Sequence, residues 1–176
     1  MMTLEELNGL SEKDAKVEFL RCCGANRWAS EMITHRPFGT RDELLSTANE
    51  VWQQLDQKDW KEAFSRHPKI GDIENLKKKF ARPPSDWRAS TAQWAQGEQS
   101  GVAQTSERVL KELAEGNNLY EAKFGYIFIV CATAKSADEM LKMLNLRLKN
   151  TSADEIRNAA EEQRKITELR LKKLLT

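Results

Sequence analysis

The stretch Phe124-Gly125-Tyr126-Ile127-Phe128-Ile129-Val130-Cys131-Ala132 decides the fold class of this chain of 176 residues. Its aromatic and β-branched side chains are typical of a buried strand. The sequence around it has the capping residues and apolar spacing of helices, and it offers no second strand for pairing. We therefore interpret residues 124–132 as a buried helix and predict an all-α fold.

Signals for helix starts and apolar spacing place the other helices along the chain. Ser11, Asn26 and Asn118 have the residue types of N-caps, and Thr40 with Glu43 has the spacing of a capping box. The expected helices are 11–22, 26–35, 40–55, one from Asp56 or Lys58 to Arg66, a short one from Asp72, 85–115, one from Asn118, and 152–176.

Residues 1–176 show no sign of a domain boundary. They contain four prolines and eight glycines, and no linker, low-complexity tract or internal repeat divides them. This length suits one domain with a sizeable core. We therefore expect one compact multi-helix domain.

The bulk composition argues against nucleic-acid and membrane partners. The formal net charge is +1, whereas a nucleic-acid-binding protein is expected to carry a basic face. The longest apolar run, from Tyr126 to Ala134, is too short to span a bilayer. The N-terminus lacks the basic-then-apolar pattern of a signal peptide.

The three cysteines, Cys22, Cys23 and Cys131, give no disulfide framework. Their number is odd, two are adjacent, and no Cys-x-x-Cys motif occurs, so a structural zinc site is also not expected. We interpret them as reduced, buried thiols of a cytoplasmic protein.

The segment His67-Pro68-Lys69-Ile70-Gly71-Asp72 contains one of the two histidines. Pro68 disfavours the helical conformation at the residue before it, so the preceding helix should end at His67. The imidazole is then presented from a stiff loop between two helices, which suits a catalytic acid or base. The alternative is that His67 only caps the helix before it.

Two predicted helices carry a charged residue on an apolar face. Glu98 lies on the apolar stripe of the helix that begins at residue 85, with Gln99 about 100° further round the same helix. Arg170 lies on the apolar stripe of the last helix, where a guanidinium suits a planar anion such as a carboxylate. The alternative is a buried structural pair between Arg170 and Glu98.

Together these side chains indicate a polar pocket. His67, Glu98, Gln99 and Arg170 could bind an anionic heterocycle and move a proton. We expect no metal, because His35 and His67 are far apart in the sequence and no third ligand is evident. We expect no cofactor either, since no phosphate-binding loop or cofactor lysine motif occurs.

Motifs along nearly the whole chain resemble, in order, those of the OHCU decarboxylases. These enzymes act on 2-oxo-4-hydroxy-4-carboxy-5-ureidoimidazoline, late in the conversion of urate to allantoin. The segment from His67 to Asp72 resembles the family's His-Pro-x-Ile-Gly-Asp signature. The other matching segments are Arg21-Cys22-Cys23-Gly24, Arg27-Trp28-Ala29, Arg36-Pro37-Phe38, Gly97-Glu98-Gln99-Ser100-Gly101, Lys123-Phe124-Gly125-Tyr126-Ile127-Phe128, Glu162-Gln163-Arg164-Lys165-Ile166 and Leu169-Arg170-Leu171.

The resemblance implies roles for particular residues. It implies catalytic roles for His67 and Glu98, and substrate-binding roles for Pro68, Gln99, Arg170 and backbone groups of Phe124, Tyr126, Ile127, Phe128 and Ile129. One departure is Ala95, where the family often has a serine, so a hydroxyl contact to the substrate is missing.

The resulting hypothesis is a cofactor-independent decarboxylase that produces (S)-allantoin and carbon dioxide from a small-molecule substrate. The resemblance also implies an all-α fold and a homodimer. Two alternatives stay open. One is a hydrolase or lyase that acts on a related ureido compound, which Ala95 leaves open. The other is a non-catalytic helical binding module in which His67 is a structural cap.

Overall fold

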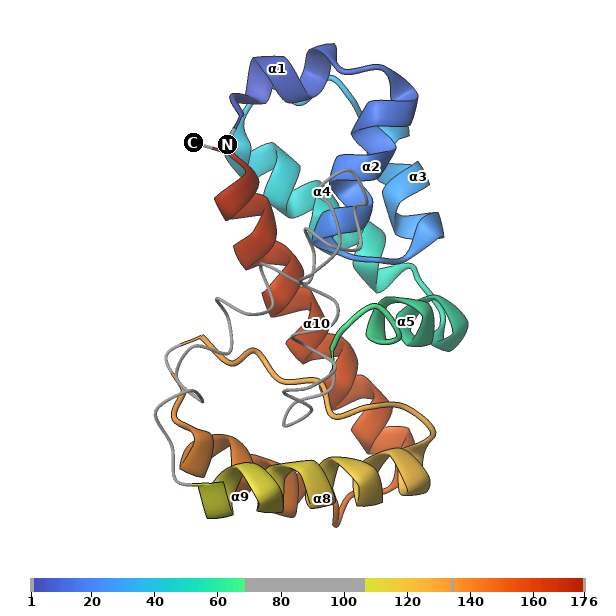
Figure 1. Cartoon of the computed structure of the whole chain (residues 1–176). Coiled ribbons are helices and arrows are strands. Elements are labelled where there is room, and N and C mark those ends of the chain that lie inside the picture. Colours follow the sequence, from blue (N-terminus) through green and yellow to red (C-terminus); the bar gives the residue numbers. More distant parts are fainter. Residues whose placement is uncertain (1, 69–106, 134, 176) are drawn as a thin grey trace.

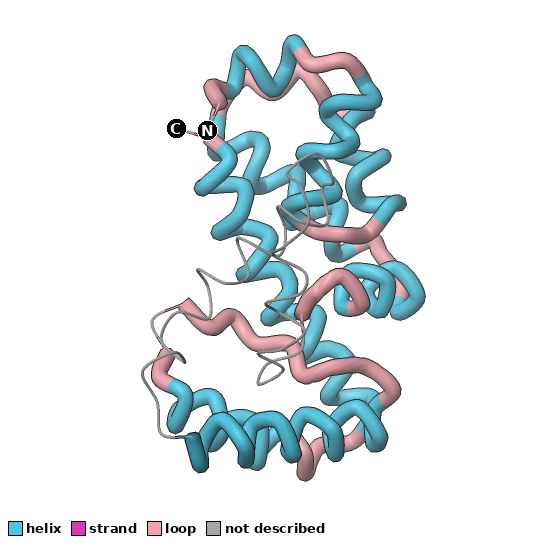
Figure 2. The backbone as a smooth tube through the Cα atoms, in the orientation of Figure 1, coloured by secondary structure: helices cyan, strands magenta, loops and turns pink. Residues whose placement is uncertain are grey.

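The computed structural model describes residues 2–68, 107–133 and 135–175, and within these residues the regular elements are all helices (Figures 1 and 2). The all-α prediction is confirmed for this part of the chain. The helices are α1 (Leu4–Gly9), α2 (Glu12–Cys22), α3 (Asn26–Thr34), α4 (Arg41–Gln53), α5 (Gln57–Phe64), α8 (Glu107–Phe124), α9 (Ala137–Arg147) and α10 (Ser152–Leu174).

Helix α10 is the element against which the others pack. It contacts α2, α4 and α5 along its length and α8 near its start, and α8 in turn packs along α9 (Figure 1). The apolar stripe predicted for this helix is confirmed, since every member is buried. Its members are Ile156, Ala159, Ala160, Gln163, Ile166, Arg170 and Leu174.

Two buried indoles join the N-terminal helices to one another and to α10. The Nε1 of Trp28 in α3 donates to the backbone oxygen of Ala48 in α4 (3.0 Å). The Nε1 of Trp52 in α4 donates to the backbone oxygen of Ala160 in α10 (3.1 Å). Each ring therefore contributes apolar burial while its one polar group is satisfied, as a buried tryptophan requires.

Several predicted helix starts are confirmed. The side chains of Ser11, Thr40 and Asp56 accept hydrogen bonds at the starts of α2, α4 and α5. The carboxylate of Glu43 accepts from the N–H of Gly39 rather than from that of Thr40, so the predicted capping box is not closed. The predicted Asn26 cap is wrong, because Ala25 is the N-cap of α3 and Asn26 is its first helical residue.

The buried helix predicted for residues 124–132 is wrong. Helix α8 ends at Phe124, and Gly125 takes the left-handed conformation with φ of 79°. That conformation is readily adopted by glycine, so it provides a clean helix end. Residues 126–132 that follow are neither helix nor strand (Figure 2), and all of them except Ile127 are buried.

The helix start predicted at Asn118 is also wrong, because Asn118 lies inside α8. Its neighbour Asn117 is fully buried and accepts a hydrogen bond from the segment after α8 instead of starting a helix. Gly116 lets α9 approach closely, since a Cβ there would lie 2.6 Å from Leu144.

Helices α1 and α9 were not anticipated from the sequence, and α5 ends at Phe64 rather than at Arg66. Of the predicted helix 85–115, residues 107–115 are described and belong to α8. The predicted helix from Asp72 lies outside the described residues.

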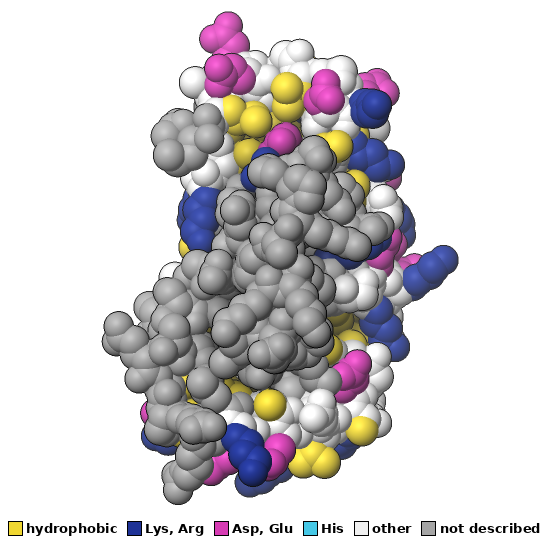
Figure 3. Space-filling model, viewed as in Figure 1, with side chains coloured by type: hydrophobic (Ala, Val, Ile, Leu, Met, Phe, Trp, Pro, Cys, Tyr) yellow, Lys and Arg dark blue, Asp and Glu magenta, His cyan; other side chains and the backbone are white. Residues whose placement is uncertain are grey.

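The first and last described residues lie side by side. The N–H of Met2 donates to the backbone oxygen of Leu174 (2.9 Å), which brings both ends of the chain to the end of α10 (Figure 1). On the face shown in Figure 3, acidic and basic side chains of the described residues are interspersed. No helix within the described ranges is long and apolar enough to cross a membrane.

Candidate active site

His67 lies on a turn that directly follows α5. Its N–H donates to the backbone oxygen of Phe64 (3.1 Å), and the adjacent Pro68 is buried. The imidazole is partly exposed, but its Nε2 atom is buried and forms no hydrogen bond with any described residue. The predicted stiff elbow is therefore present on its N-terminal side, while residues 69–72 lie outside the described part of the chain.

The surroundings of His67 keep its ring neutral at neutral pH. Burial lowers the pKa of His67 to about 3, and the positive charge of Arg170 acts in the same direction. The side chain of Gln163 acts in the opposite direction and raises the pKa. Because charge is costly in a buried setting, this imidazole can accept a proton only when another group compensates the charge.

Arg170 faces inward from α10, as its place on the apolar stripe predicts, and its exposed fraction is 1 %. Its Nη1 lies 3.5 Å from the backbone oxygen of Cys22, at the end of α2. The last carbonyls of a helix have no partner within the helix, so they are natural acceptors for such a cation. The end of α2 thus helps to hold the guanidinium beside His67.

Gln163 joins this group, although it was not predicted as a site residue. Its side chain is fully buried, and its Nε2 donates to the backbone oxygen of Cys23 (3.4 Å) and to Oγ1 of Thr167 (3.2 Å). Its Oε1 has no hydrogen-bond partner within normal distance among the described residues.

The segment after α8 lies next to the same elbow. The rings of Tyr126 and Phe64 are 5.1 Å apart, so this segment packs against the end of α5. The side chains of Phe124, Tyr126, Phe128 and Ile129 are buried in the core. The role of its backbone groups in substrate binding, which the resemblance implies, stays a prediction.

Side chains, rather than a sheet, hold that backbone in place. Asn117 Oδ1 accepts from the N–H of Phe128 (3.0 Å), and a carboxylate oxygen of Glu162 accepts from the N–H of Cys131 (2.7 Å). Arg147 Nη1 donates to the backbone oxygen of Ile129 (2.7 Å). No described residue pairs with the N–H of Ile129, although that residue is only 2 % exposed.

A buried ion pair supports Arg147 in turn. Its Nε donates to Oε1 of Glu155 (2.7 Å), its Nη2 lies 2.6 Å from the same oxygen in an ion pair, and Glu155 is fully buried. Asn150 Nδ2 donates to the other carboxylate oxygen (2.7 Å), and the hydroxyl of Tyr120 donates to the first. The guanidinium also lies 4.7 Å from the centre of the Phe128 ring. We call Tyr120, Arg147, Asn150 and Glu155 the buried network.

The structure brings together only part of the predicted site. His67, Pro68 and Arg170 lie near one another, and the segment 124–129 packs against the same elbow. Glu98, Gln99 and Ala95 lie outside the described residues. The roles of all these residues stay predictions.

Sequence reasoning missed four polar residues near this site. They are Asn117, Arg147, Glu162 and Gln163. Gln163 did carry a signal, because it is an amide on the apolar stripe of α10. The other three carry none, since their partners are backbone groups of an irregular segment.

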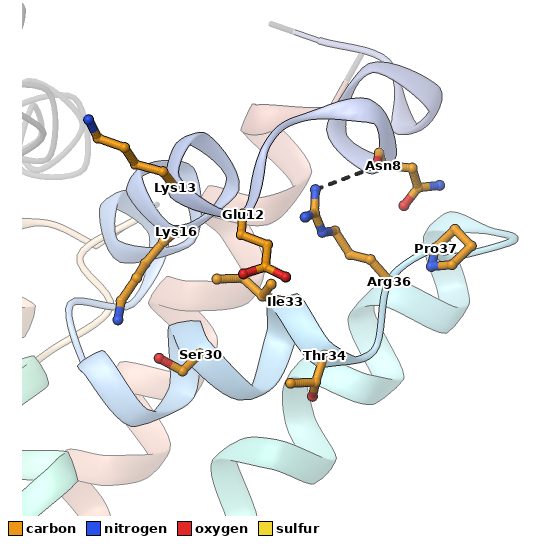
Figure 4. A pocket seen from close by; sticks show the side chains of 9 residues that line it. All are labelled: Asn8, Glu12, Lys13, Lys16, Ser30, Ile33, Thr34, Arg36 and Pro37. Atoms are coloured by element: carbon orange, nitrogen blue, oxygen red, sulfur yellow. Dashed lines mark hydrogen bonds between the residues drawn. The ribbon is translucent and has the colours of Figure 1, made fainter.

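A separate hollow lies between α1, α2, α3 and the loop after α3 (Figure 4). Its volume is about 980 Å³, and none of its lining residues belongs to the predicted site. Arg36 reaches across from the loop and donates to the backbone oxygens of Leu7, Asn8 and Leu10. Arg36 therefore stabilises the end of α1 and the turn after it.

The three cysteines are free and buried, as predicted. Burial raises the pKa of Cys22 well above its ordinary value and raises that of Cys23 to about 12. Both therefore stay protonated thiols at neutral pH and are poor nucleophiles. Within the described ranges, no three histidine, cysteine or acidic side chains gather to hold a metal ion.

Known proteins resemble this chain in sequence and in structure. The OHCU decarboxylase family model matches residues 8–172. The uric acid degradation bifunctional protein TTL of Arabidopsis thaliana is 42% identical over 90% of this chain, which spans 47% of that relative's length. A 2-oxo-4-hydroxy-4-carboxy-5-ureidoimidazoline decarboxylase of Haloferax volcanii is 23% identical over 97% of this chain and 94% of its own.

Among solved structures, an OHCU decarboxylase crystallised in the presence of (S)-allantoin matches with a TM-score of 0.72 and 42% identity. That match covers 90% of this chain and 96% of the other. A structure of (S)-allantoin synthase gives a TM-score of 0.70 at 14% identity, which shows a shared fold alone. From the extent of the family match and from this shared structure, we conclude that the chain belongs to the OHCU decarboxylase family.

Proposed function

We propose that this protein decarboxylates 2-oxo-4-hydroxy-4-carboxy-5-ureidoimidazoline to (S)-allantoin and carbon dioxide. Membership of the family supports the reaction class, and the crystallised relative was obtained with (S)-allantoin present. The observation that carries the proposal is the neutral imidazole of His67 beside the buried guanidinium of Arg170. A proton-transfer group next to an anion-binding group is what this reaction needs.

Arg170 is proposed to bind a polar or charged part of the substrate. Its guanidinium is already desolvated, so an anion that reaches it gains a strong charge-assisted hydrogen bond. The N–H of Ile129 is a second donor, since it is buried and unpaired among the described residues. Gln99 and Glu98 are proposed to complete the site from the part of the chain that the structure leaves undescribed.

His67 is proposed to handle the proton. When the carboxylate leaves as carbon dioxide, its bonding electron pair stays on the ring and is delocalised over the neighbouring double bonds. One proton is taken up from water, and the proton of the ring hydroxyl is moved to the carbon that bears the ureido group. A neutral imidazole can accept that hydroxyl proton and return it to one face of the carbon, which fixes the stereochemistry.

The reaction needs no external electron sink, so we propose that it proceeds without a cofactor. The ring itself stabilises the electron pair that decarboxylation leaves behind. The protein's task is then to position the substrate and to control the proton.

The test is a coupled assay with freshly generated urate oxidation product, which follows decarboxylation and the circular dichroism of allantoin. In His67→Asn, turnover should fall by about 10²–10⁴-fold, the usual contribution of a positioned acid or base. Binding of allantoin itself should survive, because Arg170 is unchanged. A variant that still gives one enantiomer at the parent rate would exclude His67 as the proton-handling group.

We further propose that the protein is a cytoplasmic homodimer. The three free thiols are in keeping with a reducing compartment. Leu119 in α8 and Leu146 in α9 are large hydrophobic side chains that are 64% and 63% exposed. A dimer interface over these helices would cover them, and sedimentation of the variant Leu119→Lys, Leu146→Lys against the parent tests this.

A further inference from the structure

We propose that Gln163 is a positioning residue that fixes the orientation and the tautomer of the His67 imidazole. This inference rests on the proposed function, because it concerns the group that is proposed to move the proton. Gln163 would act through His67 and not on the substrate.

The orientation of the Gln163 amide is set by its other partners. Its nitrogen lies 3.4 Å from the backbone oxygen of Cys23, which can only accept a hydrogen bond. The same nitrogen lies 3.2 Å from Oγ1 of Thr167, one helical turn further along α10. A flipped amide would place its oxygen against the carbonyl of Cys23, so the NH₂ group must face α2.

The carbonyl end of the amide is therefore turned the other way, towards His67. The Gln163 side chain raises the pKa of His67, while Arg170 is the charged described group that lowers it. Gln163 Oε1 and His67 Nε2 are both buried, and neither forms a hydrogen bond with any described residue. Leaving two such atoms unpaired is costly, so a hydrogen bond between these two side chains is favoured.

A neutral imidazole has one N–H and one lone pair, and an acceptor on one side decides which nitrogen carries the proton. With the N–H directed at Gln163, the other nitrogen presents its lone pair away from α10. That lone pair is what the proposed proton transfer requires. The backbone oxygen of Cys23 at the end of α2 thus fixes the Gln163 amide, and the amide in turn selects the tautomer of His67.

The test is nitrogen NMR of the histidine rings, because the chain contains only two histidines and exposed His35 is an internal reference. In the parent protein near neutral pH, His67 should show one protonated and one unprotonated ring nitrogen. In Gln163→Met, the two signals should move towards each other as the tautomers mix. His35 should give the same spectrum in both proteins.

Two further variants separate positioning from general support of the fold. Gln163→Glu keeps an acceptor and adds a negative charge, so the pKa of His67 and the acid limb of the kcat/KM profile should both rise. Ile166→Val shortens another buried side chain of α10 and should change neither the tautomer nor the profile. If Gln163→Met fails to fold, Thr167→Val tests the same point, because it frees the amide to rotate.

The rate provides a second readout. In Gln163→Met, kcat should fall roughly 2- to 12-fold, the factor that one neutral hydrogen bond provides, with KM little changed. An unchanged His67 tautomer in a folded Gln163→Met or Thr167→Val would overturn the inference. The NMR result does not depend on turnover, so it stands apart from failure of the proposed decarboxylation.

Discussion

Replacing Glu155 with glutamine should uncouple the buried network from the segment after α8. The carboxylate pairs with Arg147 and accepts one hydrogen bond each from Arg147, Asn150 and Tyr120. Glutamine has nearly the same shape, but it is neutral and offers one acceptor oxygen in place of two. Its NH₂ group would then face a donor, and the guanidinium of Arg147 would be buried without a counter-charge.

The expected loss follows from this geometry. Removing one partner of a buried ion pair typically costs about 3–5 kcal/mol, and the oxygen that glutamine keeps places this variant near the lower end. The matched control is Glu161→Gln, also on α10, where the carboxylate is 50% exposed and pairs with Arg164. An exposed pair of this kind contributes less than about 1 kcal/mol.

Urea unfolding of both variants at pH 7, with the parent alongside, measures the two losses from the shift of the midpoint at constant slope. The Glu155→Gln protein should also lose turnover under conditions where it stays folded, because Arg147 holds the backbone oxygen of Ile129. If the two variants lose equal stability, the buried network contributes no more than a surface pair and our account of the segment is wrong.

Two further predictions concern the proposed site. Arg170→Lys keeps the charge but loses the planar fork, so KM should rise roughly 10- to 100-fold with the helical circular dichroism unchanged; unaltered kinetics would exclude an anion-binding role. The folded protein binds fewer protons at His67 than the unfolded chain between about pH 6.5 and about 3, because the folded pKa is the lower one. The free energy of unfolding should therefore decrease as the pH is lowered through that window, by at most about 1.4 kcal/mol per pH unit from this group. Urea unfolding of the parent and of His67→Asn from pH 6.5 to 5 gives the free energy of unfolding of each protein as a function of pH. The difference between the two slopes is the contribution of His67, and equal slopes would contradict the lowered pKa.

The sequence predicted those elements whose signals are local. Ser11, Thr40 and Asp56 cap their helices with their own side chains, and the apolar stripe of α10 is buried along its whole length. Arg170 was found for the same reason, since a charge at a fixed helical spacing reveals its direction.

The segment after α8 could not be predicted in this way. Its composition is that of a buried element, but three of its backbone groups bond to Asn117, Arg147 and Glu162, which come from three different helices. No residue pattern within the segment records these partners. Gly125, whose positive φ ends α8, was the one local sign that the helix stops there.

The labelling rate of the buried thiols at the end of α2 measures how often the site opens. Cys22 and Cys23 are closed to solvent, and the backbone oxygens of the same two residues contact Arg170 and Gln163. A thiol reagent can reach them only when this part of the core opens, and an opening that separates α2 from α10 also disrupts the surroundings of His67. The labelling rate of the native protein therefore reports how often the site comes apart, and a bound ligand that spans Arg170 should slow the labelling in proportion to its occupancy.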